Sequence, residues 1–236
     1  HIPFDKRYLI GNERYSLTGF PTFYLSSSIY SCWEECNRCN LDFSNVALFK
    51  NSDKLLFLDM LLPKPNSSIQ DKTLFGIPLI LASRLKVAHD KGKFVPEYII
   101  PQLLMECVIK SRSESESEII TGIRYESTHQ SERDLIFDKF YKDDLFLNYA
   151  IPPFESSDKG ICKRIKELFD FWANTSWAEM QYKDPMINIV LTKNESNRYD
   201  ASRFGVMEKF LGRIPPKMLT YRTKSRNGIP PGALTI

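Results

Sequence analysis

The sequence lacks any hydrophobic run long enough to cross a membrane. Its longest candidate, residues 55–63, is interrupted by Asp59 and followed by Lys64, whereas a membrane-spanning helix needs roughly 20 consecutive apolar residues. The first residues also lack the basic and apolar segments of a secretory signal peptide. We therefore expect a cytoplasmic protein that has no membrane partner.

An excess of charge of one sign is also missing. The chain has 32 Lys and Arg against 29 Asp and Glu, a formal net charge of +3, which is too small to indicate a polyanion as the main partner. We therefore expect no direct binding of nucleic acid. With 236 residues, 42% of them hydrophobic, the chain is long enough to bury a substantial core.

Cysteine is scarce, and its number is odd, because the chain has five. This argues against a secreted disulfide framework and favours a reducing compartment. Cys32, Cys36 and Cys39 have the spacing by which radical SAM enzymes hold an iron–sulfur cluster. Cys32 and Cys36 also recur with Ile29 and Trp33 at the spacing of one buried helical stripe. We therefore expect buried free thiols and no metal, with an iron–sulfur or zinc site as the alternative.

The order of the expected elements favours the α+β class, because short strands and helices follow one another too irregularly for a doubly wound parallel sheet. Strands are expected at 8–10, 22–25, 45–49, 54–60, 119–125, 135–140, 146–151 and 187–192, and helices directly after Ser28 and at 98–109, 161–172 and 201–211. The Ser/Glu-rich residues 111–118 are expected to form a solvated loop. We expect a core over residues 1–153, ending at Pro152-Pro153, and a C-terminal extension over 154–236 that packs on it.

Three polar residues near the start of the chain have a distinctive spacing. Arg14 is followed ten residues later by Tyr24, which closes a short strand, and eleven residues after that by Glu35 on the next helix. On a helical wheel Glu35 lies at the edge of the apolar stripe, and Glu34 is expected to face solvent. This segment resembles the N-terminal core of the RES-domain family, which is named for an arginine, a glutamate and a serine.

The serine of that resemblance is Ser127. It ends the segment Gly122-Ile-Arg-Tyr-Glu-Ser127, which fits the family's Gly-Ile-x-Tyr-x-Ser pattern and follows a helix that carries Tyr98 and Gln102. The resemblance covers roughly residues 1–150, in four separate segments in the right order.

The resemblance implies a fold like that of ADP-ribosyltransferase toxins, with a mixed β core and flanking helices. It also implies NAD⁺ as the substrate, cleavage of the bond between nicotinamide and ribose, and service as a toxin or defence effector. A helical DNA-binding antitoxin is then an expected partner, and a homodimer is left open. No prosthetic group is required, because nicotinamide is already a cationic leaving group.

The implied roles make physical sense. The Glu35 carboxylate can stabilise the positive charge that develops on the ribose, and the Tyr24 ring can stack on nicotinamide. The Arg14 guanidinium suits the pyrophosphate, and the Ser127 hydroxyl suits the carboxamide or the ribose.

Three further residues near these motifs are expected to contact the substrate: Tyr15, Gln102 and Tyr125. His129 is expected to be a surface residue. Two other functions remain open at this point: a protein ADP-ribosyltransferase, and an inactive RES fold that serves as a binding module.

Overall fold

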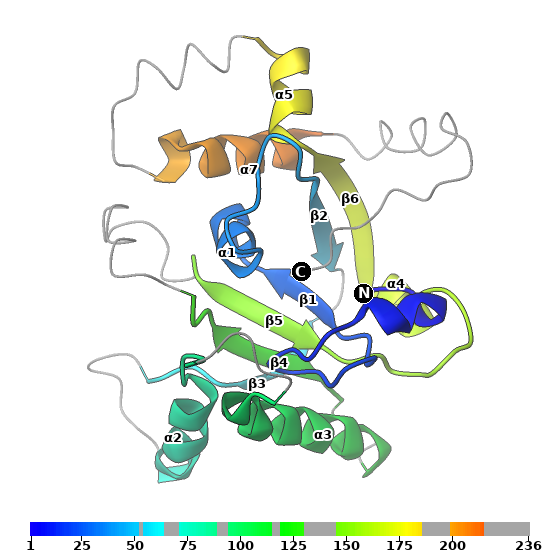
Figure 1. Ribbon diagram of the computed structural model, residues 1–236, viewed down its shortest axis with the longest axis vertical. Coiled ribbons are helices and arrows are strands. Elements are labelled where there is room, and N and C mark those ends of the chain that lie inside the picture. The colour runs from blue at the N-terminus through cyan, green and yellow to red at the C-terminus, as the bar shows by residue number, and fades with distance from the viewer. Residues whose placement is uncertain are drawn as a thin grey trace. The chain divides into compact units, whose positions relative to one another are not determined.

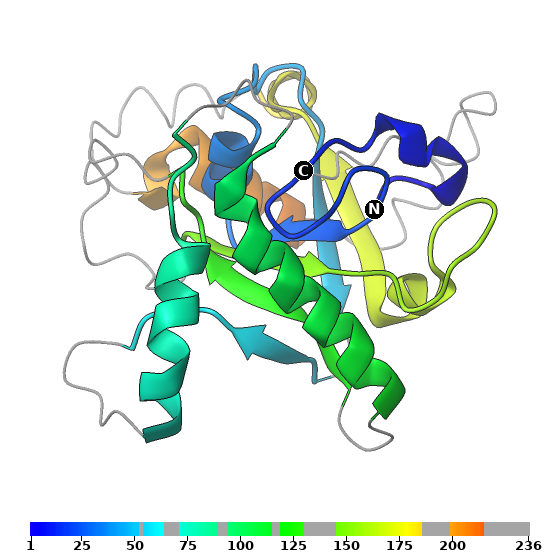
Figure 2. The same cartoon turned by 60° about the horizontal axis from the view of Figure 1, so that its bottom comes forward.

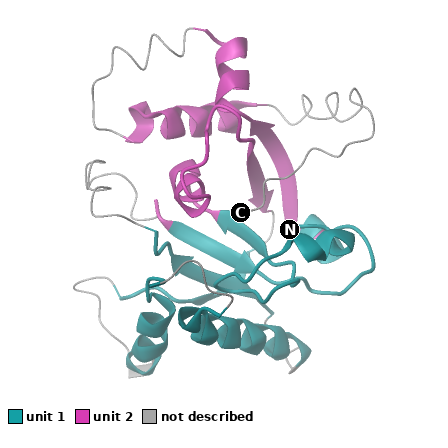
Figure 3. Cartoon of the chain, viewed as in Figure 1, with its two compact units in different colours: residues 1–25, 53–129, 147–166 teal, residues 26–52, 130–146, 167–236 magenta. Residues whose placement is uncertain are grey.

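The computed structural model describes residues 1–51, 54–63, 71–88, 94–114, 119–129, 145–185 and 199–214. The chain divides into two compact units, shown in Figure 3. Unit 1 contains residues 1–25, 53–129 and 147–166, and unit 2 contains residues 26–52, 130–146 and 167–236. This division differs from the boundary expected after residue 153, because each unit contains segments from before and after residue 153. Each unit is described by itself.

Unit 1 is built around a four-stranded mixed sheet. The strands lie in the order β1 (Phe23–Ser26), β5 (Leu147–Ile151), β4 (Ile120–Glu126) and β3 (Leu56–Asp59). β4 runs parallel to β3 and antiparallel to β5. The expected strands at 22–25, 54–60, 119–125 and 146–151 are therefore confirmed, and the mixed sheet with its helices confirms the α+β class.

Two helices cover one face of this sheet, as Figures 1 and 2 show. They are α2 (Asp71–Ser83) and α3 (Ile99–Glu114), and the short 3-10 helix η2 (Pro96–Tyr98) leads into α3. Because β3 and β4 are parallel, the chain that connects them must run back along the sheet, and both helices lie in this long connection. Their inner sides pack with the sheet around Met105, Val108 and Ile123. The first residues of the expected loop at 111–118 belong to α3, and 115–118 lie outside the described residues.

Gly122 explains why the Gly-Ile-x-Tyr-x-Ser segment begins with glycine. A Cβ atom at this position would lie 2.3 Å from the carbonyl oxygen of Ala150 and 3.1 Å from the Cα of Ile151. Both contacts are with the backbone of the neighbouring strand β5, which cannot move without breaking its pairing. The glycine therefore permits the close approach of β4 and β5.

Unit 2 contains a two-stranded antiparallel sheet, formed by β2 (Val46–Asn51) and β6 (Phe169–Thr175). Its helices are α1 (Ile29–Glu35), α5 (Trp177–Lys183), the 3-10 helix η4 (Tyr199–Ala201) and α7 (Arg203–Arg213). The core of this unit includes Ile29, Trp177, Met180 and Met207, all of which are buried. The expected helix after Ser28, the strand at 45–49 and the helix at 201–211 are confirmed.

Two expectations about local structure are wrong. Residues 8–10 are not extended, because Phe4–Leu9 form the 3-10 helix η1. The helix expected at 161–172 ends early: only Lys163–Leu168 form α4, and the aromatic, β-prone residues that follow form β6. The strands expected at 135–140 and 187–192 lie outside the described residues. Among the described residues no helix is long and apolar enough to span a membrane.

Candidate functional site

Arg14 lies in a tight turn of unit 1 that α3 holds in place. The backbone N–H of Glu13 donates to the carbonyl of Ser16 (2.9 Å), and the N–H of Ser16 donates back to Glu13 (3.2 Å). From α3, the Gln102 side-chain amide donates to Asn12 Oδ1 (2.8 Å) and to the carbonyl of Glu13 (3.0 Å). Gln102, expected to contact the substrate, therefore positions this turn.

The Arg14 guanidinium is buried, with 8% of the residue exposed. Its Nη1 donates to the carbonyls of Ser83 (3.0 Å) and Leu85 (3.1 Å), and its Nη2 donates to Thr128 Oγ1 (2.9 Å). Its Cζ lies 5.2 Å from the centre of the Tyr98 ring. Since Ser83 is the last residue of α2, the cation also sits where the helix dipole is negative. These bonds tie together three segments that are far apart in the sequence.

Arg14 has no acidic partner among the described residues. Of the ion pairs that the described part of the chain forms, none includes Arg14. The resemblance implies that Arg14 binds the pyrophosphate of the substrate; within the described residues its partners are two carbonyls and a hydroxyl, all uncharged. A buried charge without a counter-ion is costly. An anionic ligand would lower that cost.

Tyr24 reaches the Arg14 turn from β1. The backbone N–H of Tyr15 donates to Tyr24 Oη (3.3 Å), and Tyr24 Oη lies 3.1 Å from Ser16 Oγ in a second hydrogen bond. Burial raises the pKa of the Tyr24 hydroxyl well above its ordinary value, which keeps it neutral. The structure thus brings Tyr24 and the Arg14 turn together. Stacking of the Tyr24 ring on nicotinamide stays a prediction.

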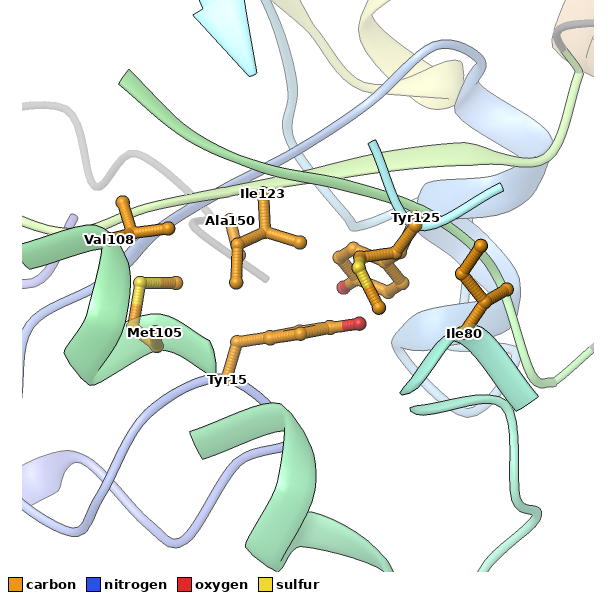
Figure 4. Close-up of a cluster of buried hydrophobic side chains, with 8 residues drawn as sticks. Tyr15, Ile80, Met105, Val108, Ile123, Tyr125 and Ala150 are labelled. Atoms are coloured by element: carbon orange, nitrogen blue, oxygen red, sulfur yellow. The ribbon is translucent and has the colours of Figure 1, made fainter. Parts of the chain in front are cut away.

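Tyr15 and Tyr125 belong to the core of unit 1. Figure 4 shows their rings among the buried apolar side chains, and the ring centres are 4.5 Å apart. Tyr15 is fully buried, and 8% of Tyr125 is exposed. Burial raises the pKa of the Tyr15 hydroxyl to about 12. Both were expected to contact the substrate. The structure gives them a packing role under the Arg14 turn, because their rings are used in the core.

Ser127 follows directly after β4. It is buried, with 5% exposed, and its Oγ accepts a hydrogen bond from the backbone N–H of His129 (3.2 Å), the geometry of a short serine turn. Its neighbour Thr128 binds Arg14, and on its other side Glu126 forms an ion pair with Arg84. His129 is exposed, which confirms the expectation of a surface residue.

Glu35 is the last residue of α1 and belongs to unit 2. It is half-buried. The start of its helix is fixed by two groups: Ser28 Oγ accepts from the N–H of Ser31 (3.0 Å), and Glu208 Oε1 accepts from the N–H of Ile29 (2.8 Å). The role of Glu35 at the substrate beside Arg14, Tyr24 and Ser127 stays a prediction, because these three residues belong to unit 1.

The expectation that Glu34 faces solvent is wrong. Only 5% of Glu34 is exposed, and its carboxylate binds Arg38 through Nε (3.1 Å) and Nη2 (3.1 Å). The reason lies after the helix: Asn37 and Arg38 have positive φ values of 53° and 57°, so the chain turns back and Arg38 covers Glu34. The side chain of Trp33 lies beneath the same guanidinium, 5.4 Å from its Cζ. Glu34 therefore stabilises the end of α1.

The three clustered cysteines are partly buried. Burial raises the pKa of Cys32 to about 12 and that of Cys36 to about 11, so both side chains are neutral thiols at pH 7. Ser44 Oγ donates to Cys39 Sγ (3.2 Å). Within the described ranges, no three His, Cys, Asp or Glu side chains are arranged to hold a metal ion. The prediction of structural thiols stays a prediction.

Thr128, Ser83 and Leu85 are the partners of Arg14 that the sequence did not reveal. Two of them act through backbone carbonyls, which leave no trace in residue identity. Thr128 is different, because its side chain accepts the bond. Its position directly after Ser127 was the one signal that could have singled it out.

A comparison with curated proteins finds a similar protein. No protein-family model and no solved structure matches the chain. The chain is 32% identical over 246 aligned positions to a protein named "Putative toxin YopC" from Bacillus subtilis (strain 168). The alignment covers 94% of this chain and 52% of that protein, so the chain spans about half the length of the curated relative. This similarity supports a relation to a toxin family.

Proposed function

We propose that this protein is a toxin-type enzyme that consumes NAD⁺ by cleaving the bond between nicotinamide and ribose. The observation that carries the proposal is the buried Arg14 guanidinium, which meets only uncharged partners among the described residues. A site with a buried cation beside hydroxyl groups suits a diphosphate-containing substrate. The Thr128 hydroxyl binds Arg14, and Ser127, its neighbour in the chain, carries a second hydroxyl.

Arg14 retains hydrogen-bonding capacity for such a ligand. A guanidinium has five N–H groups, and the bonds to Ser83, Leu85 and Thr128 use three of them. The N–H on Nε and the second N–H on Nη2 have no hydrogen-bond partner in the described part of the chain. We propose that these two groups bind the pyrophosphate of NAD⁺.

The remaining residues have proposed roles in bond cleavage. As the glycosidic bond breaks, its electron pair leaves with nicotinamide, whose ring nitrogen becomes neutral, and positive charge develops on the ribose. The Glu35 carboxylate would stabilise that charge, the Tyr24 ring would stack on nicotinamide and Ser127 would hold the carboxamide or a ribose hydroxyl. Water or inorganic phosphate then attacks the ribose carbon and gives ADP-ribose or its phosphate.

The toxin role draws on the similarity to the protein named "Putative toxin YopC". Depletion of NAD⁺ would harm the cell that contains the enzyme, so a restraining partner is part of the proposal. A helical DNA-binding antitoxin is the partner that the RES resemblance implies. The ADP-ribosyltransferase-like fold also remains part of the proposal, on the basis of the resemblance and of the mixed sheet in unit 1.

The experiment that tests this function is incubation of the purified protein with NAD⁺, with and without inorganic phosphate, followed by mass analysis. We expect free nicotinamide together with ADP-ribose, or with its phosphorylated form when phosphate is present. The Ser127→Ala variant is measured beside wild type and should consume NAD⁺ more slowly. ADP-ribose attached to a protein would instead indicate a transferase, and unchanged NAD⁺ would contradict the proposal.

A further inference from the structure

Thr128 provides the one side-chain hydrogen bond that Arg14 makes within the described residues. The other two bonds go to backbone carbonyls at the end of α2. Arg14 thus connects the end of α2 with the segment that follows β4. Thr128 itself is half-buried, so solvent competes only in part for its hydroxyl.

The segment around Ser127 is tied to the end of α2 on both sides. Before Ser127, Glu126 pairs with Arg84, and after it, Thr128 pairs with Arg14. The Arg84–Glu126 pair has side chains that are 30% and 31% exposed, so solvent screens this ion pair in part. The bond between Arg14 and Thr128 is charge-assisted and starts from a guanidinium in a residue that is only 8% exposed, so solvent weakens it less than it weakens the Arg84–Glu126 pair.

We infer that Thr128 is a positioning residue for the reaction: by binding Arg14 it holds the Ser127 turn in register with the Arg14 guanidinium. This inference rests on the proposed function, in which Arg14 and Ser127 both contact NAD⁺. Thr128 does not itself touch the substrate. Its hydroxyl affects the reaction by fixing two other residues: Arg14, to which it is hydrogen-bonded, and Ser127, which precedes it in the chain.

Loss of the Thr128 hydroxyl has two consequences. One N–H of the buried guanidinium loses its acceptor, and the Ser127 turn loses the more buried of these two ties. Loss of a hydrogen bond to a charged group destabilises the arrangement that the bond holds, so the population of the competent arrangement should fall by roughly tenfold or more. The fold of the sheet does not depend on this hydroxyl, since the register of β4 is set by its pairing with β3 and β5.

The test compares three variants by kcat, KM and urea unfolding. Thr128→Val removes the hydroxyl at constant shape, and we expect kcat/KM for NAD⁺ to fall about tenfold. Thr128→Ser restores the acceptor and should recover most of that loss. Thr22→Val is the matched control, because Thr22 Oγ1 is buried in the same unit and has no hydrogen-bond partner among the described residues; its turnover should equal that of wild type.

A double-mutant cycle separates positioning from a merely structural effect. In a Ser127→Ala background, Thr128→Val should cause a smaller loss of turnover than in wild type, because the turn it positions no longer carries the hydroxyl and only the effect on Arg14 remains. An equal loss in both backgrounds, or wild-type turnover in Thr128→Val, would overturn the inference. If wild type turns over NAD⁺ and Thr128→Val does so equally well, only this inference fails; if wild type does not consume NAD⁺ at all, the proposed function fails and the inference with it.

Discussion

Arg14 in unit 1 and Glu35 in unit 2 are held in place by different kinds of interaction. Arg14 is fixed by hydrogen bonds to residues 69 to 114 positions away in the sequence. Glu35 lies at the end of a seven-residue helix, which is too short to be stable by itself. That helix depends on its caps, Ser28 and Glu208. Hydrogen bonds to its own guanidinium therefore place the cation, whereas the carboxylate is placed indirectly, through the capped start of its helix.

This difference determines which changes should damage each unit. Unit 1 should be most sensitive to changes that disturb the close packing of its strands, because the Arg14 partners come from segments that the sheet brings together. Unit 2 should be most sensitive to loss of the polar groups that fix α1. The predictions below test this contrast, from the largest expected effect to the smallest.

Gly122→Ala should be the most damaging single change in unit 1. Its Cβ would lie 2.3 Å from the Ala150 carbonyl oxygen, and such overpacking against backbone costs about 3 kcal/mol or more. Urea unfolding should show this loss, or the variant should fail to fold. Gly76→Ala, on α2 with no atom within 4 Å of the added carbon, is the control and should be neutral or slightly stabilising. Equal stability of the two variants would contradict the role given to Gly122.

In unit 2, Glu208→Ala should lower the stability by removing a cap of α1. Glu208 accepts hydrogen bonds from the Ile29 N–H (2.8 Å) and from Tyr199 Oη (2.5 Å), so its loss should cost about 2 kcal/mol. Denaturant unfolding measures the effect. Glu208→Gln keeps an oxygen acceptor at the same place and should retain most of the stability. If both variants were as stable as wild type, α1 would not depend on this cap.

Glu34→Gln should cost less, about 1 kcal/mol, because it removes the charge but not the volume of the side chain paired with Arg38. Thermal unfolding should show a lower Tm for this variant. Glu35→Gln should leave Tm close to that of wild type, since Glu35 is half-buried and Glu34 is the carboxylate that pairs with Arg38. A larger loss for Glu35→Gln would reverse the assignment of the structural carboxylate.

Alkaline pH should destabilise unit 2 before unit 1. Burial raises the pKa of Cys32 from 9.0 to about 12, and that of Tyr15 from 10.0 to about 12. Because the folded state favours the protonated form, each contribution is fully present below the unfolded pKa and is lost as pH rises toward the folded pKa. The loss should therefore begin near pH 9 for Cys32 and near pH 10 for Tyr15. Urea unfolding under reducing conditions at increasing pH measures it, and Cys32→Ala should flatten the earliest part of the decline; an unchanged decline would contradict this.

Local sequence patterns predicted the helices and strands that neighbouring residues determine. The β-branched and aromatic run before Ser26, the Ser28 cap and the periodic apolar positions of α3 and α7 all gave elements close to the observed bounds. The helix α2 was not foreseen, and it contains Pro78 in its interior, a residue that normally argues against a helix. The helix expected at 161–172 included the first residues of β6, 169–172, which form a strand instead.

The candidate site was predictable in its residues but not in its contacts. The spacing of Arg14, Tyr24 and Ser127 was visible in the sequence, and the structure joins all three to unit 1. The acceptors of Arg14 were not predictable, because backbone carbonyls carry no residue signal. For Glu34 a signal existed: Arg38 stands four residues later, the spacing of a helical ion pair, whereas the helical wheel alone gave the wrong face.

The most direct test of the proposed function is the rate of nicotinamide release from NAD⁺ by Glu35→Gln, measured beside Glu34→Gln and wild type. Glu35→Gln should retain its fold but lose most turnover, by about a hundredfold or more, because it deletes the charge at the bond that breaks. Glu34→Gln should turn over NAD⁺ at close to the wild-type rate below its own unfolding temperature. Equal rates for Glu35→Gln and Glu34→Gln, or greater loss in Glu34→Gln, would contradict the assignment of Glu35 as the carboxylate of an NAD⁺-consuming enzyme.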